Sequence, residues 1–198
     1  MEQVPQTTVV PWADGLWTRK PLAINGDGEH LQVTAEEGSD AWRHTSYGFV
    51  HDNPHALLAP FGTQGAVEVS FVLDYDQQFD QAGMYLAISD EHWIKAGVEY
   101  CDGFPQLGAV VTNGKSDWSV ARVPEWFGRT VTIRASRAGD AVTFRARADD
   151  EPFRLVRLVP LEPDLAVHAG PMICAPTRAG LTVRFTRWAV GAPDADLH

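Results

Sequence analysis

The chain has 198 residues, with 26 acidic side chains against 16 basic ones and a formal net charge of -10. An apolar fraction of 44% with seven tryptophans can form a sizeable core, which argues against a disordered chain. The acidity disfavours a general binder of nucleic acid or of an anionic membrane surface, because both rely on clustered Lys and Arg.

Alternation of apolar and polar residues predicts β-strands along most of the chain. In chain order, these strands fall near residues 31–35, 47–50, 67–73, 82–88, 94–100, 106–112, 131–135, 142–146 and 181–190. The dipeptide Gly139-Asp140 separates two of these runs and predicts a hairpin turn. Short strands punctuated by 17 Gly and 13 Pro indicate an all-β sandwich or barrel.

The charge is distributed unevenly along the chain. Residues 1–120 hold 17 acids and 5 bases, a net of -12, whereas residues 121–190 hold 7 acids and 11 bases, a net of +4. Because no linker rich in Pro, Gly or Ser divides the strand pattern, we interpret the two parts as two faces of one sandwich. We expect a single domain over residues 8–191, with flexible termini at 1–7 and 192–198.

Targeting and redox signals predict a cytoplasmic protein. Cys101 and Cys174 are the only cysteines, and two distant thiols indicate neither a disulfide framework nor a zinc site. The N-terminal residues lack the basic and apolar regions of a signal peptide, and no apolar run approaches the length of a membrane helix. The sequence predicts no cofactor and no bound metal.

The most informative pattern lies in residues 74–119. The strands expected at 82–88, 94–100 and 106–112 would form a meander with one apolar face. The opposite face gathers polar and aromatic side chains, namely Gln81, Tyr85, Trp93, Lys95, Glu99 and Thr112. Such a set is typical of a groove for a sugar or another small molecule, with an ordinary solvated sheet face as the alternative. Lys95 and Glu99 would lie about 13 Å apart along one strand, which argues against a direct ion pair.

Three sequence blocks stand out. The first runs from Trp42 to His55, the second combines residues 80–84 with 93–99, and the third combines 110–113 with 116–119. In this order the blocks resemble the domain of unknown function thirteen-forty-nine family, which includes the fungal regulation-of-enolase protein. The first block is similar to the family signature W-R-x-T-x-Y-G-F-x-x-D-N-x-H. Pro54 and Ala56-Leu57 depart from the family pattern, in a loop expected to close the groove.

The resemblance implies a concanavalin A-like jelly-roll β-sandwich of two antiparallel sheets, with a ligand site on the concave face. Its matching blocks add four ligand-binding candidates, Arg43, Tyr47, Asp117 and Trp118. For Asp117 and Trp118, an Asx turn beside a core tryptophan is the structural alternative. Activity does not transfer with the fold.

Three other clusters of polar residues could form metal or catalytic sites. His51, Asp52 and His55 could hold a metal but lack a third histidine at a suitable spacing. Asp74, Asp76 and Asp80 form an acidic loop that could hold a structural calcium, and this possibility stays open. Glu99 and Asp117 could act as paired carboxylates, although the E-x-D-x-x-E pattern typical of glucanases of this fold lacks its final glutamate here.

We therefore predict binding of a carbohydrate or a similar neutral, polyhydroxylated small molecule, with Tyr85 and Trp93 stacking on its ring. An enzyme acting on a sugar derivative is the alternative, with Lys95, Glu99 and His55 in general acid/base roles. A regulatory protein that docks a metabolic enzyme is the third hypothesis. Its contact surface would be the arginines of the later strands, namely Arg134, Arg145, Arg147, Arg154 and Arg157.

Overall fold

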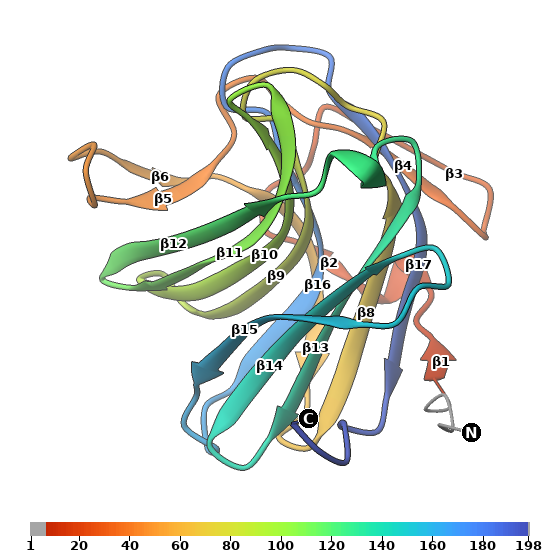
Figure 1. Cartoon of the computed structure of the whole chain (residues 1–198), viewed down its shortest axis with the longest axis vertical. Helices are drawn as coiled ribbons and strands as arrows, with labels where there is room; N and C mark the ends of the chain where they lie inside the picture. The colour runs from red at the N-terminus through yellow and green to blue at the C-terminus, as the bar shows by residue number, and fades with distance from the viewer. Residues whose placement is uncertain (1–6, 198) are drawn as a thin grey trace.

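The computed structural model describes residues 7–197 and contains two large antiparallel sheets (Figure 1). The first sheet has eight strands: β15 (Arg154–Pro160), β14 (Ala141–Ala148), β13 (Thr130–Ala138), β8 (Gly65–Val72), β17 (Thr182–Gly191), β4 (Leu31–Thr34), β3 (Ala23–Gly26), and β1 (Thr7–Val9) paired to β17. The second has seven: β12 (Lys115–Arg122), β11 (Phe104–Asn113), β10 (His92–Cys101), β9 (Gln81–Ser89), β16 (Val167–Cys174), β7 (His55–Phe61) and β2 (Leu16–Trp17).

A third, two-stranded sheet is formed by β5 (Ala41–Arg43) and β6 (Val50–Asp52). Two short 3-10 turns, at Trp12–Asp14 and Pro124–Trp126, complete the regular elements of the described residues. The predicted all-β sandwich of two antiparallel sheets is therefore confirmed. Residues 7–197 include no helix with the length and hydrophobicity needed to span a bilayer.

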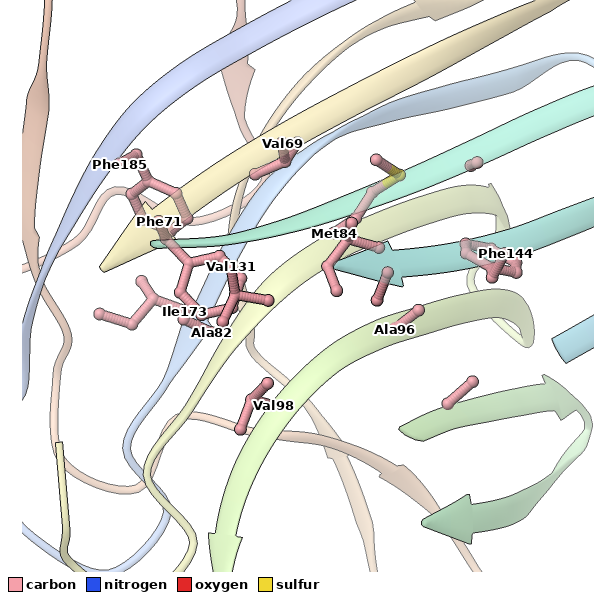
Figure 2. Close-up of a cluster of buried hydrophobic side chains, with 14 of the residues drawn as sticks. Val69, Phe71, Ala82, Met84, Ala96, Val98, Val131, Phe144, Ile173 and Phe185 are labelled. Carbon is pink, nitrogen blue, oxygen red and sulfur yellow. The ribbon is translucent and has the colours of Figure 1, made fainter. Parts of the chain in front are cut away.

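The hydrophobic core lies between the two large sheets. Because side chains alternate across a strand, every second residue points into this layer. Figure 2 shows the side chains that meet there, with Val69, Phe71, Val131, Phe144 and Phe185 from the first sheet and Ala82, Met84, Ala96, Val98 and Ile173 from the second. Their burial leaves the other face of β9, β10 and β11 available for a site.

The expected meander is present, since β10 pairs with both β9 and β11. Gly139-Asp140 forms the turn between β13 and β14, as predicted. The strand expected at 47–50 is wrong, because most of it belongs to the turn between β5 and β6. His44, Ser46 and Gly48 in this turn have positive φ angles, which a strand does not allow.

Part of the C-terminal segment is held against the first sheet. The carboxylate of Asp194 pairs with the guanidinium groups of Arg134 and Arg145. Asp194 thus contacts the first sheet within the segment expected to be flexible, and Thr7 belongs to β1. Residues 1–6 and 198, for which flexibility was also predicted, lie outside the described residues. The single-domain limits of 8–191 stay a prediction.

Candidate functional site

The β5–β6 hairpin extends beside β12, at the outer face of the second sheet (Figure 1). Within residues 7–197 its two strands pair with each other and with no strand of either large sheet. Trp42 lies opposite His51 in the hairpin register, so both side chains share one face. This hairpin forms one wall of the site described below.

Arg43 anchors the hairpin to the second sheet. Its guanidinium donates to Asp52 at 3.1 Å and to Glu91 at 2.6 Å, and its side chain is only 10% exposed. Its backbone N–H donates to the hydroxyl of Ser116 at 2.9 Å, and that hydroxyl bonds Thr112 at 2.8 Å. Arg43 and Thr112, both predicted to bind ligand, instead hold the wall in place, and neither lines the cavity.

A cavity of about 320 Å³ lies between the hairpin and the second sheet. Its volume is within the range of small-molecule sites, about 300–1,000 Å³. The lining residues come from the hairpin, from β9 to β12 and from three loops: Gly38, Asp40, Trp42, Tyr47, Phe49, His51, Phe79, Gln81, Lys95, Glu99, Val110, Trp118, Pro176 and Thr177. Five aromatic residues and a polar floor meet in this space.

The aromatic wall is built from rings that support one another. Trp42 meets Trp118 edge to face, with ring centroids 6.3 Å apart and an interplanar angle of 90°. Tyr47 contacts Trp42 at 5.7 Å and stacks on Phe49 at 5.3 Å. Trp118 is 39% exposed and Tyr47 is 60% exposed, so the wall keeps open ring surface. Tyr47 and Trp118 thus line the cavity for which the sequence proposed them.

The polar floor centres on Lys95. Its ammonium donates to the Asp40 carboxylate at 2.9 Å and to the Gln81 side-chain oxygen at 2.8 Å. Burial lowers the pKa of Lys95, but the charges of Asp40 and Glu99, the nearby Cys174 and the hydrogen bond to Asp40 together outweigh burial and raise that pKa. Lys95 therefore stays charged and held in place, which makes it a poor proton donor.

Glu99 follows Lys95 on the same face of β10 and differs from it in having no partner. Its half-buried carboxylate makes no hydrogen bond or ion pair within residues 7–197. Burial raises the pKa of Glu99 to about 7, against the opposing influence of Lys95 and with a contribution from Asp40. The cavity therefore holds a carboxyl group that changes charge near neutral pH.

A narrower cleft of about 30 Å³ continues from the cavity across the second sheet. Both spaces share Gln81, Lys95, Glu99, Val110 and Trp118 as lining residues. The floor of the cleft includes Gly97 and Gly108, which lie opposite each other in the register, and Gly83 lies opposite Gly97 on the other side. This row of glycines leaves bare backbone beside the site.

Tyr85 and Trp93, predicted to stack on a ligand, do not line the cavity. They are 7% and 2% exposed and stack on each other, with centroids 5.6 Å apart. Both belong to a second apolar cluster that includes Ala41 of the hairpin and Ala56 and Leu58 of β7. The parity of β9 and β10 places these rings on the expected face, but neighbouring segments cover them.

His55 is also displaced from the role predicted for it. It is completely buried, and its Nε2 accepts a hydrogen bond from the Glu36 backbone N–H at 3.0 Å. Its Nδ1 lies 3.1 Å from the Arg19 carbonyl, to which it donates in the neutral tautomer. Burial lowers the pKa of His55, so the ring stays neutral and hydrogen-bonds two backbone groups. The histidine that lines the cavity is His51.

Asp117 does not pair with Glu99. Its side chain does not line the cavity, because side chains alternate along β12 and the neighbouring Trp118 faces inward. Its carboxylate accepts a hydrogen bond from Arg157 at 2.8 Å. The paired-carboxylate arrangement is therefore absent at these two positions.

The acidic and histidine clusters show no metal-binding geometry. Within residues 7–197, no group of three His, Cys, Asp or Glu side chains gathers around a common point. Asp80 is fully buried and bonds Arg178, and Asp52 bonds Arg43. Ion pairs thus occupy two of the carboxylates proposed as metal ligands, those of Asp52 and Asp80.

Most arginines of the later strands also have partners inside the molecule. The pairs are Arg134 with Glu68 and Asp194, Arg145 with Asp194, Arg154 with Glu151, and Arg157 with Asp117. Arg147 places its guanidinium over the Phe153 ring, 4.5 Å from the centroid. The surface expected to attract an acidic partner is therefore largely neutralised from within.

Several residues that line the cavity are absent from the site predicted from the sequence. They are Gly38, Asp40, Trp42, Phe49, His51, Phe79, Val110, Pro176 and Thr177. Trp42, Phe49 and His51 lie inside the first block of the family resemblance, and that block is the sequence signal that could have identified them. Asp40, Phe79 and Thr177 sit in connecting segments and carry no local signal.

The family model described as Protein of unknown function (DUF1349) matches residues 17–193. This chain belongs to that family. A curated relative, Regulation of enolase protein 1 of Saccharomyces cerevisiae, is 36% identical over 181 residues, which are 91% of each chain. The resemblance read from the three blocks is thereby confirmed.

Solved structures support the same fold. The crystal structure of a functionally unknown protein from Saccharomyces cerevisiae superposes with a TM-score of 0.87 and 34% identity, covering 94% of this chain and all of the other. The lectin from Bauhinia forficata in complex with GalNAc reaches a TM-score of 0.60 at 11% identity, covering 96% of this chain and all of the lectin. At that identity the lectin is evidence for the sandwich fold alone.

Proposed function

We propose that the protein binds a carbohydrate or a similar polyhydroxylated small molecule in the cavity beneath the β5–β6 hairpin. The observation that carries this proposal is the meeting of aromatic faces with polar groups around about 320 Å³ of space. Trp42, Tyr47 and Trp118 offer apolar surface to a sugar ring, and Gln81 and Glu99 offer hydrogen-bonding groups to its hydroxyls. We further propose a cytoplasmic location, because Cys101 and Cys174 are free, buried thiols.

Replacement of one aromatic wall residue tests the proposal. Trp118→Ala should weaken the binding of any sugar that the wild type binds by about tenfold or more, because it removes an exposed ring face. Titration calorimetry against a panel of mono- and disaccharides measures the change. Phe127→Ala is the matched control, since Phe127 is 48% exposed and does not line the cavity.

The proposal fails if no sugar in the panel binds to the wild type. It also fails if Trp118→Ala and Phe127→Ala change affinity equally, because the cavity would then have no special part in binding.

Catalysis in the same cavity is a second candidate, favoured by the pKa of Glu99 near 7. Neither His55 nor Lys95 is free to assist, so Glu99 would act alone or with His51. Incubation of the wild type with the same sugars, including oligosaccharides, would reveal turnover. Loss of that turnover in Glu99→Gln, with folding intact, would identify an enzyme.

Regulation of a metabolic enzyme is a third candidate, favoured by the name of the yeast relative. In this case the protein should bind purified enolase or change its rate when the two are mixed. Arg147→Glu should weaken the effect, whereas Trp118→Ala should leave it unchanged. The reverse pattern would assign the interaction to the cavity.

A further inference from the structure

The ionisable groups of the cavity leave one carboxylate uncompensated. Asp40, His51, Lys95 and Glu99 line the space, and Lys95 is paired with Asp40. Glu99 has no ion pair within residues 7–197, and no arginine of that range lines the cavity. An anionic ligand would be repelled by ionised Glu99, whereas a cationic ligand would neutralise it.

The aromatic wall has the geometry that attracts cations. Trp42 stands at 90° to Trp118 and at 67° to Tyr47, so rings at steep angles border one space. The electron-rich face of an aromatic ring attracts a cation within about 6 Å of its centroid. Several such faces beside one unpaired carboxylate form the chemical environment that binds ammonium groups.

We propose that the ligand carries a protonated amine beside its hydroxyl groups, as an amino sugar does. The ammonium lies between the aromatic faces and Glu99, and the hydroxyls bond the remaining polar groups of the floor. This inference rests on the proposed function and narrows the ligand from a neutral sugar to a hydroxylated amine. A neutral sugar could also donate hydroxyls to Glu99, so the distinguishing property is dependence on ligand charge.

Protonation of Glu99 competes with binding of the cation. The charged or titratable groups near this carboxyl come from β10, β16, the hairpin and adjoining segments, namely Lys95, Asp40, Tyr75, Asp102, Cys101, Cys174 and His51. Because the pKa of Glu99 is about 7, its ionised fraction rises steeply between pH 6 and pH 8. Affinity for a permanently charged ligand should therefore rise roughly tenfold over this interval.

Calorimetric titration of the full chain with matched ligands tests the inference. Glucosamine, galactosamine and mannosamine are compared with glucose, galactose and mannose at pH 7. Choline is compared with its uncharged isostere 3,3-dimethylbutan-1-ol, a pair whose charges do not change with pH. We expect at least one amino sugar to bind about tenfold tighter than its parent sugar, and choline to bind tighter than its isostere.

Two variants locate the effect. Glu99→Gln should lower both affinity ratios several-fold, whatever happens to the absolute affinities, because only the weaker attraction of the aromatic faces for the cation remains. Glu29→Gln removes an exposed carboxylate outside the cavity and should leave both ratios unchanged.

The outcomes separate this inference from the proposed function. If sugars bind but charge brings no gain, or if the gain is undiminished in Glu99→Gln, the inference is overturned and carbohydrate binding stands. If choline binds and no sugar does, carbohydrate binding is overturned and charge recognition stands. If neither class binds, both are overturned.

Discussion

Glu99 combines burial with the lack of a partner, and this combination has a cost in stability. An ordinary glutamate titrates near 4.5, whereas the pKa of Glu99 in the folded protein is about 7. The folded state thus binds the proton more tightly than the unfolded state. Ionisation of Glu99 destabilises the fold as pH rises above 4.5, and the loss is complete above pH 7, at up to about 3 kcal/mol.

Glu99→Gln should therefore stabilise the protein at pH 8 and have little effect near pH 4.5. The glutamine keeps the shape of the side chain and removes the charge that burial disfavours. Urea unfolding at both pH values measures the difference, which we expect to reach up to about 3 kcal/mol at pH 8. Glu29→Gln, at an exposed position, provides the control. An equal effect of Glu99→Gln at both pH values would contradict a raised pKa.

The sequence identifies part of the polar floor of the cavity but not how deeply the residues on that face are buried. Strand parity correctly placed Gln81, Lys95 and Glu99 on one face, because the alternation of side chains is a local property. Tyr85 and Trp93 share that parity yet lie beneath other segments. Which segments cover Tyr85 and Trp93 depends on contacts between residues far apart in the chain. Strand parity carries no information about such contacts.

At the level of strands, a row of glycines sets how closely the second sheet can pack. Gly83, Gly97 and Gly108 are register neighbours on β9, β10 and β11. A Cβ on Gly97 would lie 2.2 Å from the Ala82 carbonyl oxygen, and one on Gly108 would lie 2.1 Å from that of Ser119. These neighbours are backbone atoms, so they can yield only if the strands move apart.

Gly97→Ala should therefore lower the free energy of unfolding by about 3 kcal/mol or more, since overpacking here acts on the backbone. Chemical unfolding measures the loss. Gly26→Ala is the control, because its Cβ would meet no atom closer than 3.5 Å and the residue lies in exposed β3. Similar losses in both variants would show that the close approach is not the cause.

Strand prediction succeeded where apolar side chains alternate with polar ones in the sequence, even where the folded protein covers both faces of the strand. The strand β13 shows this alternation although seven of its nine residues are buried. By contrast, β7 and β16 carry mostly apolar residues on both faces, so they show no alternation of polar and apolar residues. The hairpin strands β5 and β6 have three residues each, too few for a periodic signal.

Across the whole molecule, ion pairs tie the C-terminal segment to the first sheet. Arg134 is 2% exposed and lies between Glu68 and Asp194, each at 2.8 Å. Asp194 also bonds Arg145, and its backbone N–H donates to Ser136. Positive charge of the later strands and acids of other segments thus meet in one network.

Asp194→Ala should destabilise the fold by about 1–3 kcal/mol, because it leaves two guanidinium groups short of a partner and one of them is buried. Thermal unfolding compares it with Asp196→Ala, where only a backbone carbonyl contacts Arg145. We expect the melting temperature to fall clearly for Asp194→Ala alone. A matching decrease in both variants would assign the effect to the tail in general.

The separation of the β5–β6 hairpin from the large sheets has a consequence for how this family can diversify. The scaffold depends on residues between the sheets, whereas the ring surfaces of the site belong largely to a hairpin held by Arg43. Substitutions at Tyr47 or Phe49 can therefore change what the cavity accepts without disturbing the core. Relatives could inherit one frame and acquire different ligands by altering a dozen residues.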